Sequence, residues 1–174
     1  IYVNNNGTVN ISGGVIAANS GTKGGGICME GGSFTMSGGV ISGNQTKGSA
    51  STGNCNTGLG GGVFAQNTTV TIKDDGYITN NLETLKCGQE GFGCHGGGGI
   101  ATIGGSLAME GGFVTGNYSK EAGGGMYIGH FNQGRPVTFT MSGGIVARNV
   151  ADTSEGGGIR VSGGTTGTIR ASKG

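Results

Sequence analysis

The chain of 174 residues has no Trp, a single Pro and few charged residues, which make up only 11% of it. Its formal net charge is +1, so no strongly basic surface for nucleic acid or anionic lipid is expected. It contains no apolar run of the ~18 to 20 residues that a membrane-spanning helix needs. Glycine without a strict three-residue period and without abundant Pro excludes a collagen-like triple helix.

Glycine is the most conspicuous residue present, with 45 copies, and 33% of the chain is hydrophobic. A Gly-rich disordered linker lacks regularly placed apolar residues, whereas the apolar residues here follow a repeating pattern. A triple Gly followed by a hydrophobic residue marks each repeat. The residues at this position are Ile27, Val63, Ile100, Met126 and Ile159, with Ile1 at the same place in the first repeat. This pattern indicates a folded repeat protein.

Each repeat contains three short strand signals separated by turn residues. The first follows the triple Gly, the second alternates apolar and polar residues, and the third ends in Asn. Strands this short cannot bury a face alone, whereas stacking pairs each strand with its equivalent one coil away. We therefore expect residues 1–174 to form one all-β, right-handed, single-stranded parallel β-helix. It should have about six coils, three strands per coil and no long α-helix.

The alternation in the second strand predicts which side chains point inward. The inward columns are Val9, Phe34, Val70, Leu107, Phe139 and Ile169, and Ile11, Met36, Ile72, Met109, Met141 and Ala171. The outward columns are Thr8, Ser33, Thr69, Ser106, Thr138 and Thr168, and Asn10, Thr35, Thr71, Ala108, Thr140 and Arg170. The inward Met residues are interpreted as fillers of an irregular core.

Two further columns have distinct interpretations. The outward column of the first strand holds Tyr2, Cys28, Phe64, Ala101, Tyr127 and Arg160. It is either an exposed aromatic row for a sugar or protein partner or a surface covered by the insertion of residues 129–135. The third strands end on Asn19, Asn44, Asn81, Asn117 and Asn149. Because identical amides can hydrogen-bond along a stack, this column is predicted to be a structural ladder.

The alternation of a GGGI-type motif with strands ending in xxN resembles the Gly-rich repeats of bacterial surface β-helices. These include the chlamydial polymorphic outer-membrane protein family and related repeats of gut bacterial cell-surface proteins. The resemblance covers essentially the whole chain, although the triplets are GGG rather than GGA and the Asn motif usually begins with Val or Ile rather than Phe. It implies an extracellular or cell-surface location and an adhesin-like or scaffold role, and it transfers no catalytic residue.

Insertions are where a solenoid usually carries function. Two long ones, residues 45–59 and 82–96, join the third strand to the next triple Gly on consecutive coils, so they should lie side by side. A third insertion, residues 129–135, belongs to a different corner. We expect the two long insertions to bind a host glycan or an extracellular protein, without a cofactor.

The four cysteines are Cys28, on a first strand, and Cys55, Cys87 and Cys94, in the two long insertions. An even count in a secreted chain indicates disulfides. The preferred pairing is Cys87 with Cys94 and Cys28 with Cys55, although four cysteines allow three connectivities. A zinc site of Cys55, Cys87, Cys94 and His95 is the alternative, but the usual CxxC spacing is absent.

Two other classes of function remain open. β-Helical polysaccharide lyases and hydrolases need converging carboxylates, but the chain has only nine Asp and Glu and few lie on predicted strands. A flat hydroxyl face for ice or another repetitive surface would comprise Thr8, Ser33, Thr35, Thr69, Thr71, Thr138 and Thr140. Thr is also common on exposed strands without such a function.

The open ends of the solenoid predict further coils or end-to-end self-association.

Overall fold

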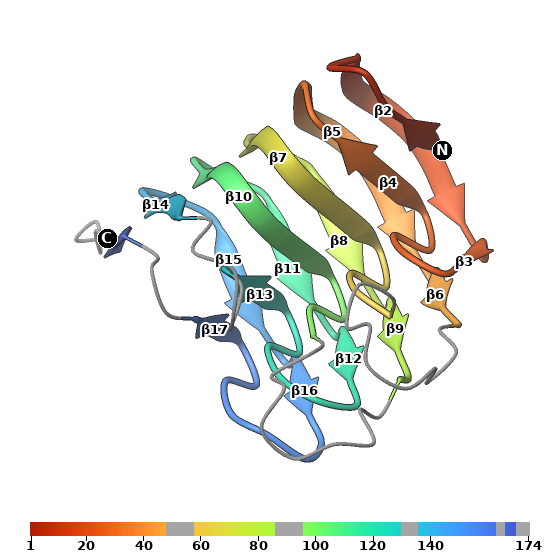
Figure 1. Ribbon diagram of the computed structural model, residues 1–174, viewed down its shortest axis with the longest axis vertical. Helices are drawn as coiled ribbons and strands as arrows, with labels where there is room; N and C mark the ends of the chain where they lie inside the picture. Colours follow the sequence, from red (N-terminus) through yellow and green to blue (C-terminus); the bar gives the residue numbers. More distant parts are fainter. Residues whose placement is uncertain (48–57, 86–95, 130–135, 163–165, 170–174) are drawn as a thin grey trace.

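The chain folds as an all-β parallel solenoid, as the sequence predicts (Figure 1). The computed structural model describes residues 1–47, 58–85, 96–129, 136–162 and 166–169. Strands within this part of the chain pair in parallel, and it contains no helix. The strands stack side by side from one end of the molecule to the other, so each inner coil lies between the coils that precede and follow it (Figure 1).

The first strands of the repeats stack in sequence order and in register. They are β1 (Tyr2–Val3), β4 (Ile27–Glu30), β7 (Val63–Ile72), β10 (Ile100–Met109), β13 (Met126–Ile128) and β17 (Ile159–Val161). The hydrophobic residues that follow the triple Gly pair from coil to coil: Ile27 with Val63, Val63 with Ile100, and Ile100 with Met126. The triple Gly therefore marks the structural repeat.

The second and third strands are longer or more continuous than predicted. Second strands lie in β2 (Thr8–Ala17), β5 (Ser33–Ser42), β7, β10, β14 (Val137–Met141) and β18 (Thr166–Ile169). Third strands lie in the last parts of β2 and β5 and in β8 (Tyr77–Thr79), β11 (Phe113–Thr115) and β15 (Ile145–Ala147). Strands β2 and β5 therefore run through the Gly-Gly pair, whereas β7 and β10 join the first strand to the second.

The register of β18 corrects one predicted alignment. Phe139 pairs with Gly167 and Met141 with Ile169. The sequence columns place Ile169 opposite Phe139 instead, so the observed register differs from the predicted one by two residues. A shift of two residues leaves every side chain on the same face of the strand. The period-two pattern therefore could not distinguish the two registers, and only the pairing with β14 decided it.

Five repeats contain a fourth strand that the sequence pattern does not predict. The fourth strands are β3 (Ser20–Gly21), β6 (Gln45–Thr46), β9 (Leu82–Glu83), β12 (Tyr118–Ser119) and β16 (Val150–Ala151), and they form a separate five-stranded sheet. They follow the ladder Asn directly, where the sequence predicts loops. Two residues are too few to produce a recognisable period, so only stacking between coils reveals them.

The interior of the solenoid contains the predicted inward columns from β2 to β14, while Ala171 lies outside the described residues. Phe34, Val70, Leu107 and Phe139 are buried, and so are the methionines of this layer apart from the partly buried Met141. These methionines pack within one continuous cluster of aliphatic and aromatic side chains. This confirms that Met fills the core.

The outward column of the first strands is buried by a second apolar cluster. Its members are Cys28, Leu59, Phe64, Ala101, Ile103, Ala122 and Tyr127. Leu59 and Ala122, which lie just before the triple Gly of their repeats, cover this face, and Lys23 places its Nζ 5.3 Å from the Phe64 ring centroid. Only Tyr2 at the end of the column is largely exposed. The exposed aromatic row is therefore wrong, and the described chain itself forms the cover.

The Asn residues that end the third strands form a hydrogen-bonded column. Each Nδ2 donates to the Oδ1 of the next coil: Asn19 to Asn44 at 2.9 Å, and Asn44 to Asn81, Asn81 to Asn117 and Asn117 to Asn149 at 3.0 Å. The same Oδ1 atoms also accept the backbone N–H of the preceding Asn at 2.9–3.0 Å. Each amide after the first also donates to a third-strand carbonyl of the previous coil. The column therefore joins every turn to its neighbour.

Replacing Asn81 by Ala should lower the free energy of unfolding by about 3 kcal/mol or more, because it leaves several buried polar partners unpaired. Asn81 accepts from the backbone and amide of Asn44 and donates to Ile41 O and Asn117 Oδ1. Asn19→Ala, at the exposed end of the column, should cost much less. Urea denaturation measures both, and equal losses would contradict a cooperative ladder.

The triple Gly segments allow neighbouring coils to approach closely. A Cβ at Gly61 would lie 2.4 Å from Gly98 O and 2.7 Å from Leu82 N. Gly62 N donates to Gly98 O and Gly99 O, both at 3.1 Å. Main chain therefore meets main chain here, with no space for a side chain.

Gly61→Ala should destabilise the fold by about 1–3 kcal/mol, since the coils must separate to admit a methyl group. Gly13→Ala is the matched control, because a Cβ at Gly13 meets nothing within 4 Å. Its effect should stay within about 0.5 kcal/mol. Thermal unfolding of the two variants tests this, and a neutral Gly61→Ala would show that the coils are not in tight contact.

Candidate functional site

The two long insertions begin side by side on one edge of the solenoid. In the parallel pair β6–β9, Gln45 lies opposite Leu82 and Thr46 opposite Glu83. The insertions therefore leave the coil from adjacent rungs. Residues 48–57 and 86–95, which make up most of each insertion, lie outside the described residues, as do residues 130–135 of the third insertion.

The same two insertions return to adjacent rungs. Gly60 N donates to Gly96 O at 3.1 Å, and Gly58 N donates to Thr22 O at 2.8 Å. Leu85, near the start of the second insertion, lies so close to Gly58 that a Cβ there would meet its side chain at 2.6 Å. Leu59 and Leu85 are both buried. Both ends of each insertion are thus held on one corner, as the repeat spacing predicts.

Glu83 is a fully buried carboxyl group at the base of the second insertion. Leu85 N donates to its Oε1 at 2.5 Å, and Ser119 Oγ on the next coil donates to its Oε2 at 2.8 Å. Burial raises the pKa of Glu83 to about 7, although these hydrogen bonds act in the opposite direction. No sequence pattern indicates this group, because Glu83 lies in a segment that the sequence predicts to be a loop.

The surroundings of Glu83 are polar on both neighbouring coils. Thr46, opposite Glu83 in the register, has a buried Oγ1 without a hydrogen-bond partner among the described residues. On the other side, Glu121 N donates to Ser119 Oγ at 3.2 Å. The charge of Glu121 also contributes to the raised pKa of Glu83. The interior of this corner is therefore poorly suited to a charged carboxylate above neutral pH.

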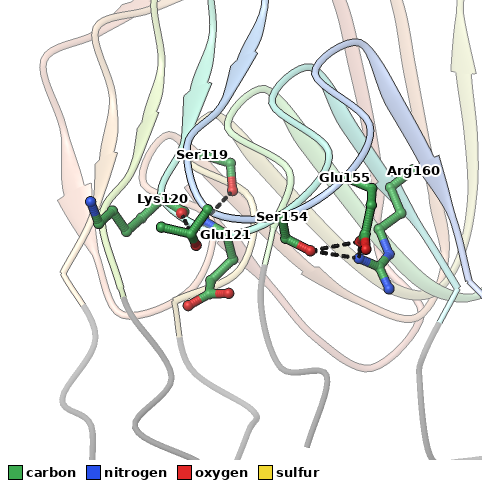
Figure 2. Close-up of polar contacts among 7 residues, drawn as sticks. Ser119, Lys120, Glu121, Ser154, Glu155 and Arg160 are labelled. Carbon is green, nitrogen blue, oxygen red and sulfur yellow. Dashed lines mark hydrogen bonds and ion pairs between the residues drawn. The ribbon is translucent and has the colours of Figure 1, made fainter. Parts of the chain in front are cut away.

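A corner of ion pairs and hydrogen bonds follows the fourth strands on the outside. Figure 2 shows Ser119, Lys120 and Glu121 after β12, Ser154 and Glu155 after β16, and Arg160 on β17. Arg160 forms an ion pair with Glu155 and donates to Ser154 Oγ at 2.9 Å, and Lys120 forms an ion pair with Asp152. Water and salt screen such exposed pairs, so they contribute little to stability. One pair joins two coils and the other braces a turn.

The cysteines do not form the predicted framework in the part of the chain that is described. Cys28 is a free thiol in the second apolar cluster, so its predicted bond to Cys55 is absent. Burial raises the pKa of Cys28 to about 11, which keeps the thiol protonated and unreactive near neutral pH. Cys55, Cys87, Cys94 and His95 lie outside the described residues, so the Cys87–Cys94 bond and the zinc alternative stay predictions. No group of three His, Cys, Asp or Glu elsewhere in the described chain is placed to hold a metal ion.

The predicted hydroxyl residues lie in two columns on the outer face of the second strands. Thr8 pairs with Ser33 and Ser33 with Thr69, while Thr35 pairs with Thr71. The columns continue through Ser106 and Ala108 of β10 to Thr138 and Thr140 of β14. Thr8, Thr69, Thr138 and Thr140 are exposed, and Ser33, Thr35 and Thr71 are partly exposed. We call these two columns the hydroxyl face.

An outward apolar column on the third strands was not recognised from the sequence. It consists of Val15, Val40, Tyr77, Phe113 and Ile145, which pair in this order. The Tyr77 and Phe113 rings stack with centroids 4.6 Å apart and planes at 6°. Val15 and Ile145 are at least half exposed. The available signal was the recurrent apolar residue at the start of each segment that ends in Asn.

Replacing Glu83 by Gln should remove a pH-dependent loss of stability. Glu in an unfolded chain titrates near ~4.3, whereas Glu83 in the folded chain titrates at about 7. The free energy of unfolding is therefore highest below ~pH 4 and decreases as the pH rises toward 7. Above pH 7 it stays about 3 kcal/mol lower. Glu83→Gln should be the more stable protein at pH 8, and the difference should vanish at pH 4.

Glu110→Gln is the control, because Glu110 is exposed directly after strand β10. Urea denaturation of the wild type and both variants between pH 4 and pH 8 measures the effect. A Glu83→Gln variant with the same pH dependence as the wild type would show that this carboxyl group is not the source.

Comparisons with known proteins give no relative: no family model, curated protein or solved structure matches the chain. No helix among the described residues is long and apolar enough to cross a membrane. The assignment therefore stops at the fold, an all-β parallel solenoid with two long insertions on one edge.

Proposed function

We propose that the chain is a non-enzymatic extracellular or cell-surface module that presents the insertions 45–59 and 82–96 for adhesion. One observation carries this proposal: both insertions leave and re-enter the solenoid on adjacent rungs of the same corner. The β6–β9 pairing aligns their starts, and the hydrogen bond from Gly60 to Gly96 aligns their ends. Two neighbouring segments thus share one rigid base.

The base is suited to display because it is rigid along the stack. The Asn ladder and the close main-chain contacts of the triple Gly join successive coils next to the insertions. A pre-organised scaffold lowers the entropy lost when a surface segment binds. The resemblance to Gly-rich repeats of bacterial surface proteins agrees with this role, and the expected partner is a host glycan or an extracellular protein.

Replacing residues 48–57 and 86–95 by short Gly-Ser turns should abolish binding to that partner. Ligands are first found by screening the intact chain on a glycan array and against host extracellular proteins. Affinity is then measured by surface plasmon resonance for the two single replacements and for the double replacement. Each single replacement should weaken binding, and the double replacement should remove it.

Replacement of residues 130–135, in the insertion at a different corner, is the matched control and should leave affinity unchanged. Circular dichroism verifies that each variant keeps the β-solenoid. Failure to find any saturable ligand, or binding that persists in the double replacement, would contradict display by the paired insertions.

A further inference from the structure

The hydroxyl face is a regular two-dimensional array. Parallel strands lie ~4.8 Å apart, and alternate residues along a strand lie ~6.6 Å apart. Because the second strands pair in register from β2 to β14, the two columns repeat at these spacings over successive coils. Each column therefore presents its side chains in coil order on one side of the sheet.

The register of β18 extends this array. Thr166 pairs with Thr138 and Thr168 with Thr140, whereas the sequence pattern placed Thr168 and Arg170 at these positions. The backbone pairing thus places a Thr at each of these two register positions on β18, and Arg170 lies outside the described residues.

The hydroxyl face carries no charge and no aromatic ring. Its members in the described part of the chain are Thr, Ser, Asn and Ala, and the nearest ionisable residues along the strands, Lys73 and Glu110, follow the last inward positions. A neutral face complements a neutral ligand, since no charge must be paired or desolvated. Sugar rings typically pack on aromatic side chains, which are absent here.

Thr suits such a face because its side chain is stiff. The β-branched side chain restricts χ1, so each hydroxyl and methyl group is held in place before any ligand arrives. Hydroxyl groups both donate and accept hydrogen bonds to water. A rigid array at fixed spacing therefore orders a water layer with the same repeat.

We propose that the hydroxyl face binds ice, with its two columns holding the first layer of lattice water. This goes beyond the display role and does not depend on the insertions. The ligand is the neutral, periodic lattice that an uncharged, periodic face of Thr and Ser complements. Each contact is weak, and the number of repeated contacts along the stack provides the affinity.

The test is thermal hysteresis and ice-crystal shaping, measured on the intact chain by nanolitre osmometry. The intact chain should separate the freezing and melting points and produce faceted crystals. Thr71→Tyr, at the centre of one column, should lose most of this activity because the ring protrudes from the plane. Thr69→Tyr, at an exposed position of the other column, should do the same and serves as the second variant if Thr71→Tyr does not fold.

Thr79→Tyr is the matched control, because it adds the same ring to the outward face of the third strand in the same coil. It should keep full activity, as should the double insertion replacement. Absence of thermal hysteresis and ice shaping in the folded intact chain would overturn the proposal. So would wild-type activity in both Thr69→Tyr and Thr71→Tyr, or an equal loss in Thr79→Tyr. Adsorption to microcrystalline cellulose without any effect on ice would assign the face to a polysaccharide surface instead and also overturn it.

Discussion

Hydrogen bonds between consecutive coils are the interaction on which the rest of this structure depends. Strands pair with their equivalents one coil away, and the turns pair too, because the triple Gly segments bring main chain against main chain. The Asn ladder completes this network inside the solenoid by satisfying the backbone groups where the chain bends. Every coil is thus held by its neighbours, and a local distortion is transmitted along the stack.

This constraint explains why the interior tolerates so few exceptions. The apolar core is continuous, and a second apolar cluster covers the outer side of the first strands. Glu83 is one exception, a buried carboxyl group that accepts hydrogen bonds from Leu85 N and Ser119 Oγ. Its position beside the second insertion links the stability of that corner to pH, since ionisation in a buried site is costly.

The two surfaces with functional interest differ in kind. The paired insertions are attached to the solenoid at one corner through their described ends, whereas the hydroxyl face is part of the repeating sheet itself. An insertion can change in sequence without disturbing the stack, because its ends are fixed by β6, β9 and the Gly contacts. The register of the coils sets the geometry of the hydroxyl face, so that geometry cannot change independently of the fold.

The sequence by itself determined the solenoid, the inward columns of the second strand and the Asn column, because each follows from a short period that recurs in every repeat. It also determined that the long insertions start on neighbouring coils. Only the tertiary structure decided the register of β18, the two-residue fourth strands and the burial of Phe64 and Tyr127. A period of two leaves registers that differ by two residues equivalent. Burial of an outward column depends on residues such as Leu59 and Ala122, which reach it only after the chain has turned around the coil.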